Sequence, residues 1–263
     1  MKPYLYMIKI KLLLALSYRY EVFITFITQI ILLFVSSFFW KAAYKGIDSV
    51  AMVNERQMLI YSVISIILGN IFSISVEDSI RQKVRKGNVA VDFLKPVNIF
   101  YMYFSEDIGN VVTSVVQQII PILIVSSLFI VVPAPASAVH FILFLVSVCC
   151  SYLIMWLISA IFGLFYFWVI DIGPLGEIKN YMILILSGSF VPVWLFPPII
   201  QKTLVFLPFV YIYQFPISVF IGKTSPMPAL TGIAVQAVWI LGFGLLFGKI
   251  KRHVEKNIMV QGG

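Results

Sequence analysis

The strongest candidate for nucleotide chemistry in this sequence is the triplet Gly222-Lys223-Thr224. A phosphate-binding P-loop needs a glycine, four further residues and then Gly-Lys-Ser/Thr, so that successive backbone N–H groups surround the phosphates. Position 217, where the first glycine would stand, is Ile, and Ser225-Pro226 follows the triplet. We therefore predict that this chain binds no ATP itself.

Residues suited to metal or nucleophilic chemistry are few. His140 and His253 are the only histidines, and Cys149 and Cys150 are neighbours inside an apolar run. A zinc site takes three or four protein ligands, and adjacent cysteines rarely bridge each other. We predict no catalytic residue, no metal site and no disulfide framework.

Charge is concentrated in residues 77–107, which hold 10 of the chain's 30 charged side chains. Gly87-Asn88 and Lys95-Pro96 interrupt this stretch, and an apolar patch, residues 89–94, lies between the two interruptions. A segment of this kind suits docking on a cytosolic protein. A solvated connector that carries positive charge is the alternative, and the pattern alone does not choose between the two.

The rest of the chain is apolar enough to be surrounded by lipid. Of its 263 residues, 61% are hydrophobic and 11% are charged, whereas soluble domains are about 45–50% apolar and about 25% charged. About 20 helical residues cross the hydrocarbon layer of roughly 30 Å. Uncharged stretches of that length occur at Val22–Trp40, Gln57–Val76, Ile108–Val132, Phe141–Ile170, Asn180–Gln201 and Thr224–Gly248. We predict a single all-α integral membrane domain, residues 1–263, with six transmembrane helices, membrane lipid around it and no nucleic-acid partner.

The positions of the basic residues predict the orientation. If the N-terminus is cytoplasmic and the six spans alternate, the inner segments carry 14 Lys and Arg residues and the outer segments carry 5. Cytoplasmic segments of membrane proteins are enriched in Lys and Arg. We expect a multi-pass protein of the cell (plasma or inner) membrane with both termini in the cytoplasm.

Two segments do not read as simple spans. Residues 192–228 hold 7 of the 13 prolines, and broken backbone at membrane depth persists only where protein or a watery cavity satisfies its hydrogen bonds. We predict outer re-entrant or interfacial helices there, before the last span; a seventh span at Thr203–Gly222 is the alternative.

Residues 1–20, with four tyrosines and four basic residues, predict an N-terminal interfacial helix, with a frayed basic tail as the alternative.

Uncharged polar residues in the first two spans are candidates for a substrate path. Thr25, Gln29 and Ser36 share one face of the first span, and Asn70 lies in the second. Hydrogen bonding to neighbouring helices is the alternative role for such residues.

Two further features of the spans are a regular series of small residues and the absence of charged residues. Ser65, Gly69 and Ser73 recur at every fourth position, a spacing that lets helices approach closely within one chain or between two. The six spans as drawn contain no Asp, Glu, Lys or Arg. Because intramembrane charges mark ion pathways and proton relays, their absence argues against an ion-coupled transporter.

The stretch Arg85-Lys-Gly-Asn-Val-Ala-Val-Asp-Phe-Leu-Lys-Pro-Val-Asn98 resembles the cytosolic-loop signature of ATP-binding-cassette (ABC) exporter permeases. The resemblance is to the small six-span branch of the type-2 (ABC-2-like) class. It implies that residues 1–20 form a connecting helix and that residues 77–107 form a coupling loop seated on an ATPase subunit. The implied coupling residues are Glu77, Arg81, Arg85, Lys86, Gly87, Asp92, Phe93, Leu94, Lys95 and Pro96.

The same resemblance implies partners. Two ABC ATPase subunits would bind ATP and Mg²⁺, and a second permease chain, identical or paralogous, would pair with this one. No cofactor is expected in this chain itself.

Two function classes follow from these observations. The first is the permease subunit of an ABC exporter, not itself an enzyme, which moves an amphiphilic drug, peptide or lipid-like substrate outward with a separate ATPase as its motor. The alternative is a stand-alone membrane channel or lipid scramblase without ATP coupling.

Overall fold

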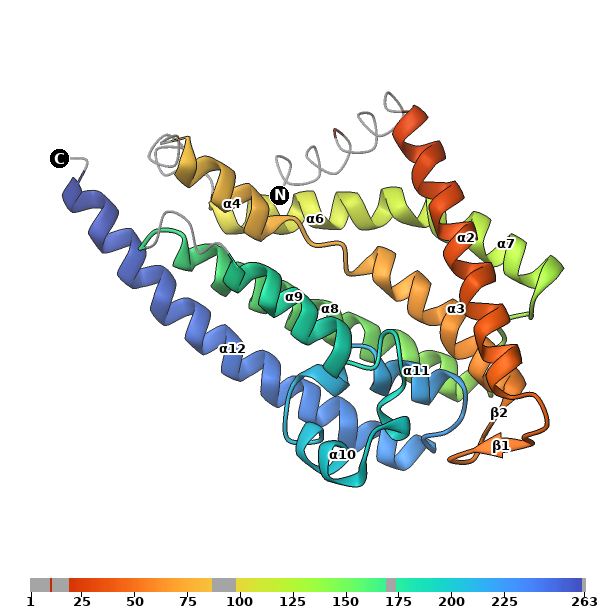
Figure 1. Cartoon of the computed structure of the whole chain (residues 1–263). Coiled ribbons are helices and arrows are strands. Elements are labelled where there is room, and N and C mark those ends of the chain that lie inside the picture. The colour runs from red at the N-terminus through yellow and green to blue at the C-terminus, as the bar shows by residue number, and fades with distance from the viewer. Residues whose placement is uncertain (1–9, 11–18, 87–97, 169–173, 262–263) are drawn as a thin grey trace.

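The described part of the protein is mainly helical (Figure 1). The computed structural model describes residues 10, 19–86, 98–168 and 174–261. The longer helices are α2 (Arg19–Ala43), α3 (Glu55–Ile71), α4 (Val76–Arg85), α6 (Ile99–Ser114), α7 (Ile120–Phe129), α8 (Ala138–Phe165), α9 (Pro174–Leu186) and α12 (Pro226–Gln261). The short elements are β1 (Ser49–Val50), β2 (Val53–Asn54), η1 (Val115–Ile119), η2 (Val193–Leu195), α10 (Pro198–Leu204), η3 (Phe209–Tyr211) and α11 (Gln214–Phe220).

Five stretches within the described residues are helical, long and apolar enough to cross a membrane. They are Val22–Ala43, Glu55–Arg85, Ile99–Phe129, Ala138–Phe165 and Pro226–Glu255. Each overlaps one of the predicted spans, and together they confirm an all-α membrane protein. The predicted N-terminal interfacial helix, residues 1–20, lies almost wholly outside the described residues.

The predicted span Asn180–Gln201 is not one helix. α9 starts earlier, at Pro174, and ends at Leu186. Its 13 residues rise about 20 Å, less than the hydrocarbon layer of roughly 30 Å. The helix ends there because Gly188 has a φ of +80°, which a right-handed helix excludes.

α8 is the central helix of the bundle, because α12, α11 and α4 all pack against it (Figure 1). The α4 contact is close: a Cβ at Gly163 of α8 would lie 2.8 Å from Cδ1 of Ile80 and 3.3 Å from Cα of Glu77. Trp156 and Leu164 of α8 share a buried cluster with Val76 and Ile80 of α4. α4 is therefore packed onto α8 rather than projecting as a free loop.

The charged stretch is shorter than predicted, because α6 begins at Ile99 instead of after Asp107. Phe100, Met102 and Tyr103 of its first turns are buried in the cluster with α4 and α8. Asp107 thus lies inside a candidate span and is fully buried. Its Oδ1 accepts hydrogen bonds from the backbone N–H (2.8 Å) and hydroxyl (2.6 Å) of Ser75, and its Oδ2 accepts one from Trp156 Nε1 (3.1 Å).

The proline-rich region, residues 192–228, folds as short pieces. Pro197 and Pro198 stand at the start of α10, and Pro208 precedes η3. α11 is seven residues long and entirely buried. Between Thr203 and Gly222 the structure has no helix long enough to cross a membrane, which favours the broken-helix interpretation over a seventh span.

The elements at the two ends of the bundle differ. Figure 1 places the end of α4, the start of α6 and the C-terminal end of α12 toward one side. β1, β2, α10 and α11 gather toward the other side. The cytoplasmic orientation expected from the basic residues stays a prediction.

The side chain of Gln236 joins α12 to α8 and to η3. It is fully buried, and its Nε2 donates to the carbonyl of Tyr211 (2.8 Å) and to the hydroxyl of Ser151 (3.0 Å). The hydroxyl of Ser147 donates to Gln236 Oε1 (3.1 Å). The carbonyl of Tyr211 also accepts a hydrogen bond from the Ser151 hydroxyl (2.8 Å), so Gln236 and Ser151 together satisfy a backbone group beside the broken helix.

Replacing Gln236 with Leu should destabilise the protein, because the buried Ser147 hydroxyl then loses its acceptor and the Tyr211 carbonyl loses one of its two donors. We expect the free energy of unfolding to fall by about 1–3 kcal/mol, measured as a lower midpoint of thermal unfolding in detergent. Leu241→Ala, on the exposed face of the same helix, is the matched control and should change the midpoint little. An unchanged midpoint for Gln236→Leu would show that these hydrogen bonds add nothing to stability.

Candidate functional site

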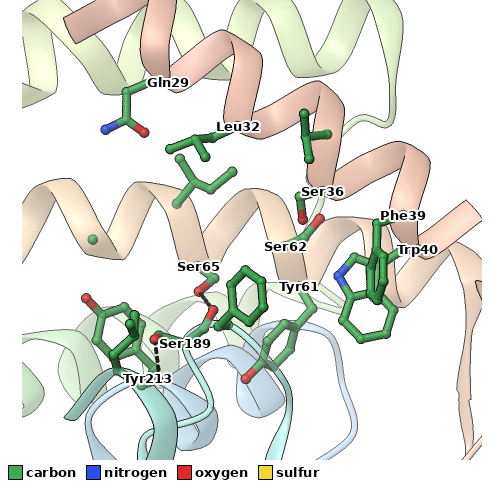
Figure 2. A pocket seen from close by; sticks show the side chains of 15 residues that line it. Gln29, Leu32, Ser36, Phe39, Trp40, Tyr61, Ser62, Ser65, Ser189 and Tyr213 are labelled. Carbon is green, nitrogen blue, oxygen red and sulfur yellow. Dashed lines mark hydrogen bonds between the residues drawn. The ribbon is translucent and has the colours of Figure 1, made fainter. Parts of the chain in front are cut away.

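A cavity of about 460 Å³ lies between α2, α3 and the segment that follows α9 (Figure 2). α2 and α3 supply most of the wall, and Ser189, Phe190 and Tyr213 close the side nearest the short helices. The lining residues are Gln29, Leu32, Val35, Ser36, Phe39, Trp40, Tyr61, Ser62, Ser65, Ile66, Gly69, Leu184, Ser189, Phe190 and Tyr213. None of them is Asp, Glu, Lys or Arg.

Several polar groups of this cavity already have partners in the protein. Tyr61 donates to the carbonyl of Gly188 (2.5 Å), and Ser65 donates to the carbonyl of Ser189 (2.5 Å). The amide of Gln29 donates to Oδ1 of Asn70 (3.4 Å). The cavity therefore presents apolar surface with a few hydroxyl and amide edges, a composition that suits binding and not bond-breaking chemistry.

The predicted path residues are only partly brought together. Gln29 and Ser36 line the cavity. Asn70 is buried behind it, where its side chain holds Gln29 and donates to the carbonyl of Ile66 (2.9 Å). Thr25 lies one turn before Gln29 and outside the lining.

The sequence did not identify several of the residues that line the cavity. Ser65 and Gly69 belong to a small-residue spacing that indicated close helix packing, yet both lie on the cavity wall. Their spacing was the one available signal that this face of the second span lacks bulk. Tyr61 and Tyr213 carried no such signal, because an aromatic residue in an apolar helix is compatible with lipid contact or with core packing.

The wall near Tyr213 is held by a second polar cluster. Gln214 Oε1 accepts hydrogen bonds from the Tyr61 hydroxyl (2.9 Å) and from the backbone N–H of Val193 (3.0 Å), and the Gln214 N–H donates to the carbonyl of Ser187 (2.9 Å). Gly188 permits this arrangement, because a Cβ there would lie 2.6 Å from Gln214 Oε1. The segment after α9 is thereby fixed to α3 and α11.

The predicted coupling residues separate into three groups. Arg85 and Lys86 are exposed at the end of α4, and Arg81 forms an exposed ion pair with Asp78 (2.8 Å). Glu77 instead points inward, where its carboxylate pairs with Lys179 of α9. The others lie outside the described residues: Gly87, Asp92, Phe93, Leu94, Lys95 and Pro96.

In the triplet Gly222-Lys223-Thr224, which resembles the end of a P-loop, the lysine contacts other parts of the structure. Lys223 lies in the turn between α11 and α12, where its Nζ donates to the carbonyl of Ala51 in the β1–β2 turn. The same Nζ lies 4.9 Å from the centre of the Trp194 ring, and burial lowers the pKa of Lys223. Within the described residues, no three His, Cys, Asp or Glu side chains are grouped to hold a metal ion.

Comparison with known families gives a match over most of the chain. The model of the family described as ABC-2 family transporter protein matches residues 30–252. This range includes all of the cavity wall except Gln29, and both members of the Glu77–Lys179 ion pair. No curated protein matches the chain.

Replacing Gly188 with Ala should destabilise the protein, because alanine disfavours a φ of +80° and its Cβ would displace Gln214. We expect a loss of about 1–3 kcal/mol in the free energy of unfolding, measured by thermal unfolding in detergent. Gly69→Ala is the matched control: a Cβ there meets only the Tyr213 hydroxyl, at 3.9 Å. Equal unfolding midpoints for both variants would contradict the assigned role of Gly188.

Proposed function

The chain belongs to the ABC-2 transporter family, and on this premise we propose that this membrane permease component of an ABC transporter serves an exporter. The proposed substrate is amphiphilic (a drug, a peptide or a lipid-like molecule) and moves outward. ATP and Mg²⁺ are bound by two separate ATPase subunits. A second permease chain, identical or paralogous, completes the complex in the cell membrane, with both termini of each permease in the cytoplasm.

The observation that supports this substrate class is the cavity beside α2 and α3. Ligand pockets are usually about 300–1,000 Å³ and mainly apolar, with a small number of placed polar groups. This cavity has a volume of about 460 Å³ and its wall lacks charged side chains. A sugar or an ion would leave many polar groups without partners there, whereas an apolar molecule with a few polar atoms would not.

The route for energy is proposed to run through α4 and the segment that follows it. The end of α4, where Arg85 and Lys86 are exposed, lies toward the same end of the bundle as the start of α6 (Figure 1). These residues would form the charged edge of an ATPase contact, with the apolar patch at 89–94 as its centre.

Filling the cavity should block transport. A Leu at Gly69 would project into the cavity from α3, where the glycine has open space beside it. We expect Gly69→Leu to lower ATP-dependent outward movement of a fluorescent phospholipid about tenfold, equivalent to ~1.4 kcal/mol. The measurement uses proteoliposomes that contain the permease and its proposed ATPase partner, with a membrane-impermeant quencher to report the leaflet.

The matched control for this variant is Gly242→Leu, at a glycine of α12 that also has open space around it but lies away from the cavity. It should transport like the wild type, and both variants should bind the ATPase normally. Lipid movement at the same rate without ATP would favour the scramblase alternative instead.

The apolar patch after α4 should dominate ATPase binding. An apolar anchor at the centre of an interface typically contributes about 2 kcal/mol or more, so we expect Phe93→Ala to weaken ATPase association roughly 30-fold. Gly87→Val should weaken it as well. Transport should fall with association, while insertion and pairing of the permease stay normal. Association is measured by co-purification at graded ATPase concentrations.

Neutralising one charge at the edge, as in Arg85→Gln, is the comparison and should have a mild effect, since exposed ion pairs contribute about 0–1 kcal/mol. Replacing residues 85–95 with a Gly/Ser linker tests the whole segment. Wild-type ATPase binding and transport in that variant would show that the segment is a connector only.

A further inference from the structure

One buried ion pair joins α4 to α9. Lys179 Nζ donates to Glu77 Oε2, and the two side chains are only 7% and 11% exposed. The Lys179 ammonium also lies 5.4 Å from the centre of the Phe162 ring of α8. The Asp78–Arg81 and Lys251–Glu255 pairs, by contrast, each lie within one helix and are more exposed.

The first turns of α9 are shaped around the Glu77 carboxylate. A Cβ at Gly176 would lie 2.9 Å from Glu77 Oε1. A side chain at this position would therefore displace the carboxylate. A polar cavity of about 210 Å³ surrounds the pair and is also lined by Tyr166, Glu177 and Asn180. Glu77 therefore contacts α9 and not the surface that would face an ATPase.

The other end of α9 forms part of the substrate cavity. Leu184 lies five residues after Lys179, about 7.5 Å along the helix axis, and lines the cavity together with Ser189 and Phe190. The Ser189 carbonyl accepts the hydrogen bond of Ser65 on the opposite wall. α9 thus connects the ion pair to Leu184 of the cavity wall without an intervening break, whereas Ser189 and Phe190 follow after the helix ends at Leu186.

We propose that the Glu77–Lys179 pair is the mechanical link between the ATPase-facing segment and the substrate cavity. This inference rests on the proposed function. When the ATPase displaces α4, the pair carries α9 with it, and α9 moves Leu184 relative to the part of the wall that Ser189 and Phe190 form against α3. The two residues position the wall and do not contact substrate.

The physical basis of the link is the cost of separating two buried charges. An ion buried without its partner is strongly unfavourable, whereas a pair that stays together keeps each charge compensated. α4 and α9 therefore move as one body as long as the pair persists. Apolar residues in place of both ions would keep the packing, since such replacements are often neutral or stabilising, but would let the two helices slide past each other.

The first test uses the double variant E77L/K179M in the complete complex with its ATPase. We expect normal insertion, normal ATPase binding and continued ATP hydrolysis. Movement of the fluorescent phospholipid per ATP hydrolysed should fall roughly 3- to 30-fold, the range for residues that carry coupling between distant sites. The matched control is K251Q/E255Q, which removes an ion pair within α12 and should leave this ratio unchanged.

The second test does not depend on folding of a pair variant. Spin labels are placed at three exposed positions, Phe38 on α2, Gln82 on α4 and Ile185 on α9, after Cys149 and Cys150 are replaced by Ser. Between the nucleotide-free and vanadate-trapped complexes, the Gln82–Ile185 distance should stay constant while the Phe38–Ile185 distance changes.

The outcomes separate the two proposals. A wild-type transport ratio in E77L/K179M, a constant Phe38–Ile185 distance, or a Gln82–Ile185 change of more than one helical turn, about 5.4 Å, would each overturn the link while the transport function stands. Absence of any ATPase binding by the wild-type permease would refute the proposed function and the link with it.

Discussion

The structure depends on one constraint: backbone groups that a broken helix leaves over, away from water, must find partners inside the protein. α9 ends at Leu186, and the chain from there to α11 runs through short pieces. Two glutamines satisfy this backbone. Gln214 holds the segment at Ser187 and Val193, and Gln236 holds the carbonyl of Tyr211. With these contacts in place, irregular chain persists beside apolar helices.

The cavity is a consequence of that break. Because α9 stops early, the segment at Ser189 and Phe190 lies across α3 and forms a wall that a continuous helix would not provide. The same hydrogen bonds that satisfy the broken backbone keep the wall in place. The hydroxyls of Tyr61 and Ser65 are used for this purpose, which leaves a surface that is mainly apolar to a ligand.

Several features were predictable from the sequence because they depend on composition summed along one segment. The long apolar stretches, the excess of basic residues at one end and the broken proline-rich region all have this character. The span boundaries were less accurate. The charge of Asp107 led to the prediction of a loop at that position. Asp107 instead lies inside α6, where it is buried and accepts hydrogen bonds from Ser75 and Trp156. The predicted span began at Asn180 because Lys179 carries a charge. α9 begins earlier, since Glu77 pairs with Lys179 and allows this lysine to be buried within the helix.

By itself, the sequence determined that the protein is an all-α membrane protein with a charged segment between its second and third spans. Apolar length, charge position and proline content are local properties, and the bilayer acts on each segment separately. Only the tertiary structure decided which residues form the cavity and which charges face inward. Glu77 and Lys179 are 102 positions apart, and Tyr61 and Gln214 are 153 positions apart. Such pairs depend on how the helices pack against one another across the bundle. The periodicity of one segment does not indicate which distant residue each of its side chains will contact.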